Sequence, residues 1–138
     1  MGRIKDTELF TLIKNFLTIY LPVQRRASPH TVTDYRIVLD QFLTFVADRK
    51  KVPYMSVNFS MINKAMVELY LEHLTQEKKF TPATRNNRLA AIKSFVSYAS
   101  ACKTEYIAVM NEISGIKVQK DDPFSKVDYM TEEAVKAF

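Results

Sequence analysis

Glycine is nearly absent from this chain, and its scarcity limits the folds that the chain can adopt. Gly2 and Gly115 are the only glycines among the 138 residues. Sheets and phosphate-binding loops normally need more, because tight turns and close backbone approach to a ligand favour a residue without a Cβ. Apolar residues instead recur at spacings of three and four, the period of an amphipathic helix. The sequence therefore predicts an all-α fold.

Five helices are predicted from this spacing and from the residues at their ends. Pro22 is expected to end the first helix, because proline removes a helical hydrogen bond. Ser60 is expected to cap the third helix, since serine is a favoured N-cap. Residues 52–59 show no helical period and are expected to form a linker. The predicted helices span residues 7–21, 29–48, 61–77, 82–100 and 104–113.

Two of these helices begin with similar tetrapeptides that lie 53 residues apart. Residues 28–31 read Ser-Pro-His-Thr, and residues 81–84 read Thr-Pro-Ala-Thr. A helix N-terminus carries unpaired N–H groups and partial positive charge, so it can hold a phosphate. If the two helices lie side by side and point the same way, their starts form one basic, hydroxyl-rich edge. Two capped amphipathic helices would also share part of this pattern without any common role.

Basic and polar side chains surround both helix starts. Arginine can pair with guanine and asparagine with adenine, and either can hold the phosphate backbone. Arg85 and Arg88 can instead extend over the rim of the core, with their charges in water. Asp34 would repel phosphate unless a base such as Arg36 pairs with it. The candidate DNA-binding residues are Arg25, Arg26, Ser28, His30, Thr31, Thr33, Lys78, Lys79, Thr81, Thr84, Arg85, Asn87 and Arg88.

Charge is unevenly distributed along the chain, whose net charge is +5. The first 104 residues carry sixteen Lys or Arg against eight Asp or Glu, whereas the last 34 carry four against seven. A basic body suits a polyanion such as nucleic acid. Cys102 is the only cysteine, which excludes an internal disulfide, and it is expected to be half-buried. With no signal segment and no apolar run of ~20 residues, the chain is expected to be soluble and cytoplasmic.

Together the motifs resemble the N-terminal core-binding domain of the tyrosine recombinases, the phage-integrase family. The first matching motif consists of Ser28, Thr31, Tyr35, Leu39 and Phe42. The second consists of Thr81, Pro82, Thr84, Leu89, Ile92 and Phe95. The third, at residues 129–135, is similar to the opening of the family's catalytic domain. Each motif is loose, but their order and spacing cover the chain from about Phe10 to Phe138.

This resemblance implies a SAM-like orthogonal bundle of four to five helices that forms one half of a C-shaped clamp around duplex DNA. Residues 1–114 would be the core-binding domain, 115–129 a linker, and 130–138 the truncated start of the catalytic domain. The helices at 29–48 and 82–100 would lie towards the DNA. Subunits of the parent protein would assemble as a tetramer on two DNA sites, whereas this fragment is expected to be a monomer. The contacts carried over from the family are Ser28, Thr31, Thr33, Thr84, Arg85, Asn87 and Arg88.

No catalytic site is expected in this chain. In the family, a nucleophilic tyrosine with Arg, His and Lys partners lies in the C-terminal domain, which the resemblance implies is absent here. Tyr35 and Tyr98 fall on apolar stripes and are expected to be core residues. His30 and His73, the only histidines, lie far apart and outside any metal-binding motif. We expect no cofactor and no bound metal.

Two other functions fit parts of the pattern. A helical protein-interaction module could use the basic surface to bind an acidic partner. Its binding would depend less on salt than DNA binding does, because DNA binding releases condensed counterions. A helix-turn-helix regulator fits less well, because residues 78–82 connect two helices through Lys-Lys and Pro instead of a short turn with glycine.

Overall fold

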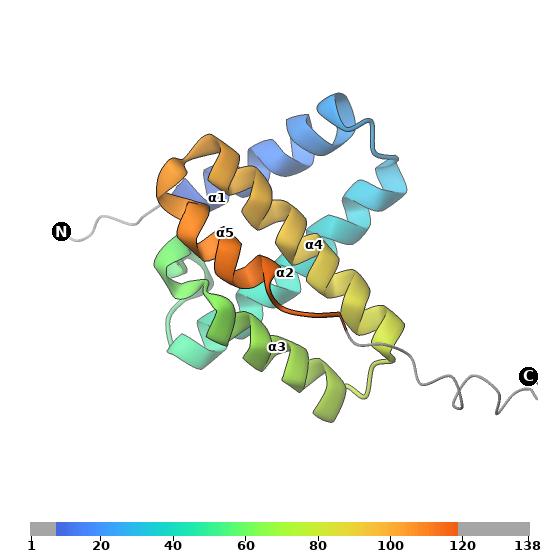
Figure 1. The fold of residues 1–138 in the computed structure, drawn as a ribbon, viewed down its shortest axis with the longest axis vertical. Coiled ribbons are helices and arrows are strands. Elements are labelled where there is room, and N and C mark those ends of the chain that lie inside the picture. Colours follow the sequence, from blue (N-terminus) through green and yellow to red (C-terminus); the bar gives the residue numbers. More distant parts are fainter. Residues whose placement is uncertain (1–7, 119–138) are drawn as a thin grey trace, which may run out of the picture.

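The computed structural model describes residues 8–118, and these residues contain helices and turns but no strand. Figure 1 shows some helices that cross one another steeply and others that run in nearly the same direction. The all-α orthogonal bundle predicted from the sequence is therefore confirmed. The elements are α1 (Glu8–Asn15), the π-helical segment η1 (Phe16–Gln24), α2 (Pro29–Lys50), the 3-10 turns η2 (Tyr54–Ser56) and η3 (Phe59–Met61), α3 (Lys64–Gln76), α4 (Pro82–Cys102), the 3-10 turn η4 (Thr104–Tyr106) and α5 (Ile107–Ser114).

Pro22 does not end the first helix, so that prediction was wrong. The helix continues through Pro22 as η1 and ends at Gln24. In an α-helix the proline ring clashes with the carbonyl four residues earlier. The wider π turn relieves this clash, and the Arg25 amide then bonds the Tyr20 carbonyl at 2.8 Å.

Ser60 does not cap the third helix, which begins later than predicted. Ser60 lies within η3, where the Asn58 side chain accepts a hydrogen bond from its amide. The cap of α3 is Asn63, whose side chain accepts from the Met66 amide at 2.9 Å. The predicted linker therefore contains two 3-10 turns, and it buries Phe59 in the core.

The core forms around α4, which packs against α2, α3 and α5. Phe16 of η1 is fully buried and joins three elements, because its ring contacts Tyr35 of α2 and Phe95 and Tyr98 of α4. Tyr35 and Tyr98 pack against the core as predicted but are only partly buried. Cys102 is exposed instead of half-buried, because it is the last residue of α4 and lies beyond the buried Ala99 and Ser100.

Helices α2 and α4 cross instead of lying side by side. Near the start of α2, Tyr35 shares the Phe16 ring with Tyr98 near the end of α4. Further along α2, Gln41 bonds Arg88 near the start of α4. Both helices begin on the right-hand side of Figure 1 at separate places, so their starts share one side of the molecule without forming a continuous edge.

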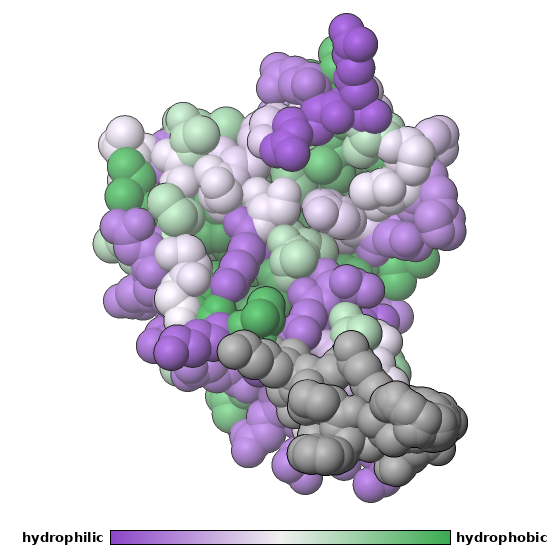
Figure 2. Space-filling view, turned by 45° about the vertical axis from the view of Figure 1, so that its right-hand side comes forward, coloured by the Kyte–Doolittle hydropathy of each residue, from purple (hydrophilic) through white to green (hydrophobic). Residues whose placement is uncertain are grey.

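The side of the molecule on which both helices begin is turned forward in Figure 2. On the part of this face that the described residues form in Figure 2, hydrophilic side chains are mixed with residues of intermediate and apolar character. No described helix is long and apolar enough to cross a membrane. Most of the predicted linker, residues 119–129, and the helix start predicted at 130–138 lie outside the described residues.

Candidate nucleic-acid interface

Two corners of the chain, 53 residues apart, have the same backbone geometry. We define the α2 corner as residues 20–31 and the α4 corner as residues 73–84. In the first, the Ala27 amide bonds the Leu21 carbonyl at 2.8 Å, and in the second the Phe80 amide bonds the Leu74 carbonyl at 3.0 Å. The repeat seen in the sequence is therefore a repeat of backbone structure that extends back into the preceding helices.

Each corner contains one non-glycine residue in the left-handed region, again 53 residues apart. Arg26 has a φ of 54° and Lys79 a φ of 55°. A residue with a Cβ pays roughly 1–2 kcal/mol for this conformation, so glycine would be the cheaper choice at both places. The chain instead holds an exposed cationic side chain at each corner.

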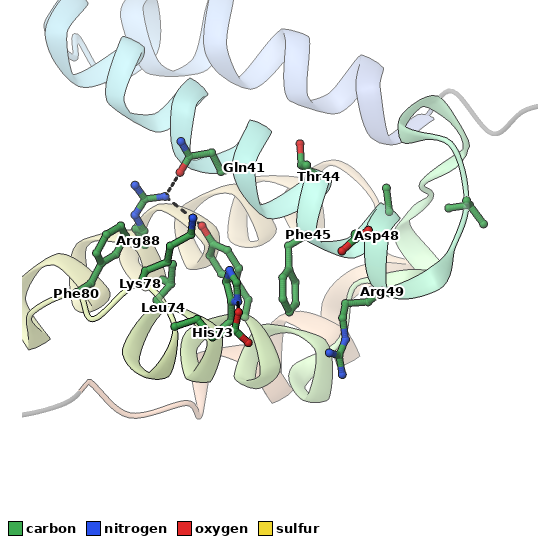
Figure 3. A pocket seen from close by; sticks show the side chains of 14 residues that line it. Gln41, Thr44, Phe45, Asp48, Arg49, His73, Leu74, Lys78, Phe80 and Arg88 are labelled. Carbon is green, nitrogen blue, oxygen red and sulfur yellow. Dashed lines mark hydrogen bonds and ion pairs between the residues drawn. The ribbon is translucent and has the colours of Figure 1, made fainter.

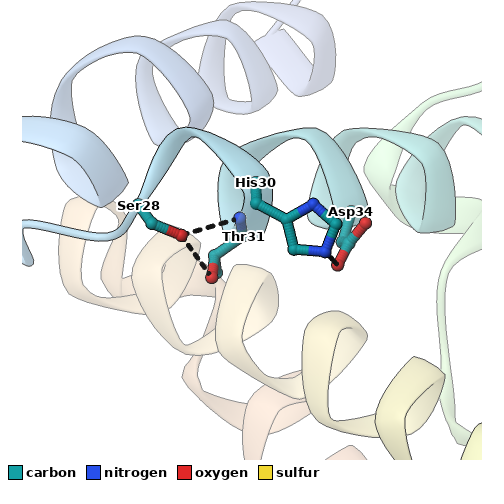
Figure 4. Close-up of polar contacts among 4 residues, drawn as sticks. All are labelled: Ser28, His30, Thr31 and Asp34. Carbon is teal, nitrogen blue, oxygen red and sulfur yellow. Dashed lines mark hydrogen bonds and ion pairs between the residues drawn. The ribbon is translucent and has the colours of Figure 1, made fainter.

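The helix that follows each corner is capped in the same way. Ser28 Oγ accepts a hydrogen bond from the Thr31 amide and donates one to Thr31 Oγ1, both at 3.1 Å (Figure 4). Thr81 Oγ1 accepts from the Thr84 amide at 3.2 Å and donates to Thr84 Oγ1 at 3.1 Å. The capping hydroxyls are thus engaged within the protein, and the Thr31 and Thr84 hydroxyl protons remain to bond an external acceptor.

The basic side chains that precede each cap are exposed. They are Arg25 and Arg26 at the α2 corner and Lys78 and Lys79 at the α4 corner. The Arg25 guanidinium donates to the Tyr20 hydroxyl at 3.1 Å, and this hydrogen bond raises the pKa of Arg25. Both corners therefore combine cations in water with a helix N-terminus, the combination that attracts phosphate.

The first turns of α2 carry two further candidate residues and one carboxylate next to them. His30 and Thr33 are both exposed. Asp34 pairs with His30, whose Nε2 lies 3.3 Å from Asp34 Oδ2 (Figure 4). The neighbour suggested from the sequence, Arg36, is not its partner, because residues four apart in a helix lie on one face and residues two apart do not.

Two arginines of α4, predicted as a pair, have different surroundings. Arg85 is half-buried, donates to Asn86 Oδ1 at 3.3 Å, and lines a hollow with the α3 carboxylates Glu68 and Glu72. Arg88 lies instead on the side of α4 that meets α2. Asn87, between them, is exposed.

The guanidinium of Arg88 is held by residues from three other parts of the chain. Its Nη1 donates to Gln41 Oε1 of α2 and, at 3.1 Å, to the Tyr70 hydroxyl of α3 (Figure 3). Its Cζ lies 5.0 Å from the centre of the Phe80 ring, a cation–π contact. Burial raises the pKa of Tyr70, and the bond from Arg88 opposes that rise.

These partners of Arg88 line a pocket between α2, α3 and the α4 corner. Phe45 and His73 line it with ring centres 5.1 Å apart, and Arg49 and Lys78 add positive charge to its lining. Sequence reasoning missed Gln41, Tyr70 and Phe80 as functional neighbours. No local signal could have found the first two, because they lie 47 and 18 residues from Arg88 in the chain.

The described residues offer no constellation for metal chemistry. Within residues 8–118, no three His, Cys, Asp or Glu side chains come together as a metal site would need. The candidate residues therefore gather at two separate corners and at the crossing of α2 and α4. An arrangement of cations, hydroxyls and helix N-termini of this kind can bind an extended anion.

Comparison with known proteins identifies relatives of this arrangement. The family described as phage integrase, N-terminal SAM-like domain, matches residues 13–103. An integrase/recombinase of Sinorhizobium fredii, y4rC, is 31% identical over 135 residues, which cover 96% of this chain and 40% of that protein. The tyrosine recombinase XerC of Myxococcus xanthus is 34% identical over 92 residues, 67% of this chain and 28% of that protein. No solved structure matches. The chain thus spans less than half the length of these curated relatives.

Proposed function

Because this chain belongs to the phage-integrase family, as the N-terminal SAM-like domain of a tyrosine recombinase, we propose that it binds duplex DNA for the catalytic domain of its parent protein. The observation that supports this proposal best is the repeated corner. Two capped helix N-termini, each beside an exposed cation in the left-handed conformation, begin on one side of the bundle. A polyanion that extends across that side would contact both N-termini.

In this proposal the corners hold phosphates. Arg26 and Lys79 supply charge. The hydroxyls of Thr31 and Thr84 and the amides of the second residues of α2 and α4, His30 and Ala83, supply hydrogen bonds. Backbone contacts of this kind fix the position of a protein on duplex DNA without reading its sequence. The remaining candidate residues on α2 and α4 lie within the first turns after each corner, where a helix reaches towards the bases.

The parent protein, in the same proposal, breaks and rejoins DNA strands through a tyrosine of its catalytic domain. Residues 1–114 are the core-binding half of a clamp, 115–129 connect it to that domain, and 130–138 begin it. Subunits of the parent assemble as a tetramer on two DNA sites, and this chain alone is a monomer.

Fluorescence anisotropy of a labelled mixed-sequence duplex, titrated with the full chain at several salt concentrations, tests the proposal. We expect log K to fall linearly with log salt, with a slope of about −0.9 per phosphate neutralised. Absent duplex binding, or binding that does not respond to salt, would contradict it and favour a protein-interaction module.

A further inference from the structure

Arg88 differs from the other basic candidates because its guanidinium has a fixed orientation. Lys78 and Lys79 are exposed, and Arg25 and Arg26 are exposed as well. Arg88 is half-buried and is held from α2, from α3 and from the α4 corner at once. Fixing a long side chain before binding lowers the entropy that binding has to remove.

The contacts that fix Arg88 leave one edge of its guanidinium unused. Arginine has five N–H donors in a rigid fork. Both bonds to the protein, to Gln41 and to Tyr70, come from Nη1 (Figure 3). The Nε–Nη2 edge, with the other three donors, has no hydrogen-bond partner among residues 8–118. Two parallel N–H groups on one rigid edge match a pair of acceptors on a single planar group.

In the proposed complex with DNA, the position of Arg88 in the fold brings the Nε–Nη2 edge close to the major groove. Arg88 is the seventh residue of α4, about two turns beyond the Thr81 cap and one turn beyond Thr84, where the α4 corner ends. If the α4 corner rests on the phosphate backbone, the next turn faces the bases, as in other helices that enter the major groove. Gln41 lies beside it at the crossing of α2 and α4.

We infer that Arg88 is the specificity-determining residue of this domain and that its Nε–Nη2 edge pairs with O6 and N7 of a guanine in the major groove. This inference rests on the proposed function. Guanine is the base that offers two acceptors on its major-groove edge, and arginine is its commonest partner. Phosphate can be held by flexible surface lysines, whereas telling one base from another requires a fork of fixed direction. Gln41, Tyr70 and Phe80 are positioning residues that act through Arg88.

Arg88→Lys is the informative variant, because lysine keeps the charge but lacks the planar fork. Arg49→Lys is its matched control, since the Arg49 guanidinium also lies over an aromatic ring, 5.7 Å from the centre of Phe45, but Arg49 is exposed near the end of α2 and is not a candidate contact. Gln41→Ala removes one of the two hydrogen bonds that orient the Arg88 guanidinium and leaves Arg88 itself unchanged. Circular dichroism and thermal unfolding of each variant show whether the bundle is folded.

The experiment is a binding selection from a pool of randomised duplexes with the full chain, followed by sequencing. We expect the unmodified protein and Arg49→Lys to enrich guanine at one position. Arg88→Lys should lose that enrichment, with affinity for the pool kept within a few-fold, and Gln41→Ala should weaken it. With the enriched duplex, 7-deazaguanine at that position should weaken the unmodified protein about tenfold and leave Arg88→Lys unaffected.

Three other results are informative. Binding without any base preference would overturn the inference and leave the proposed function intact. A preference that survives Arg88→Lys, with affinity lowered for all sequences alike, would show that Arg88 contacts phosphate or supports the fold. Failure of the folded, unmodified chain to bind any duplex in the pool would contradict the proposed function itself.

Discussion

The α2 and α4 corners share a backbone but differ in what supports them. Ala27 of the first corresponds to Phe80 of the second, and Tyr35 corresponds to Arg88, both at an interval of 53 residues. Phe80 of the α4 corner stacks with Arg88 in the following turn, and Arg88 links α4 to α2 and α3. Beyond the α2 corner, Tyr35 packs on Phe16 in the core, and within the corner Arg25 lies over the Tyr20 ring. In our proposal, one backbone geometry therefore serves two roles: phosphate binding at both corners, and a fixed arginine that follows one of them.

Removing the charges of both corners should have the largest effect on DNA binding. With Arg25, Arg26, Lys78 and Lys79 all changed to Gln, we expect affinity for a mixed-sequence duplex to fall by about 100-fold near 0.1 M salt. The salt slope should become less negative by up to about 3.6, at about 0.9 for each lost phosphate contact. Anisotropy at several salt concentrations measures both. A variant with two substitutions at one corner should lose about half of the slope change; loss of all of it would show that a single corner binds DNA.

Changing Arg88 to Met should destabilise the fold, because Arg88 links the α4 corner to α2 and α3. The substitution leaves the buried Tyr70 hydroxyl without its donor and removes the contact with Phe80, so we expect the free energy of unfolding to fall by about 1–3 kcal/mol. The matched Arg85→Met should change it by less than about 0.5 kcal/mol. Urea unfolding measures both values. Equal effects of the two variants would mean that the network around Arg88 does not support the fold.

Removing either N-cap should have smaller and matching effects. Ser28→Ala and Thr81→Ala should each lower the free energy of unfolding by about 1 kcal/mol, because each leaves one first-turn amide uncapped. Denaturant unfolding of the two single variants and the double variant gives the values. If one variant costs several times more than the other, the two corners are not energetically equivalent despite their common geometry.

Glycine at the left-handed positions should have the smallest effect on stability. Arg26→Gly and Lys79→Gly remove a Cβ from a conformation that disfavours it, so we expect thermal stability to stay level or rise slightly. Each variant should nevertheless make the salt slope of DNA binding less negative by about 0.9. A clear loss of stability would show that the side chains of Arg26 and Lys79 support the fold instead of serving binding.

The sequence predicted the fold well because caps and apolar spacing are local signals. Ser28-Pro29 and Thr81-Pro82 marked the starts of α2 and α4 correctly. Pro22 and Ser60 misled because tertiary packing overrode local preference, extending one helix as a π segment and placing Ser60 in a 3-10 turn. At the candidate interface, the sequence repeat located both corners. The crossing of α2 and α4 and the hydrogen bonds from Arg88 to Gln41 and Tyr70 could not be predicted, because both depend on how distant segments pack.

The most direct test of two corners acting together is a two-dimensional amide NMR titration of the full chain with a short mixed-sequence duplex, at low and then at higher salt. We predict shifts at both corners and in the turns that follow them, within residues 25–36 and 78–93, that diminish together as salt rises. Shifts at one corner alone, or shifts confined to α1 and α5, would contradict the account.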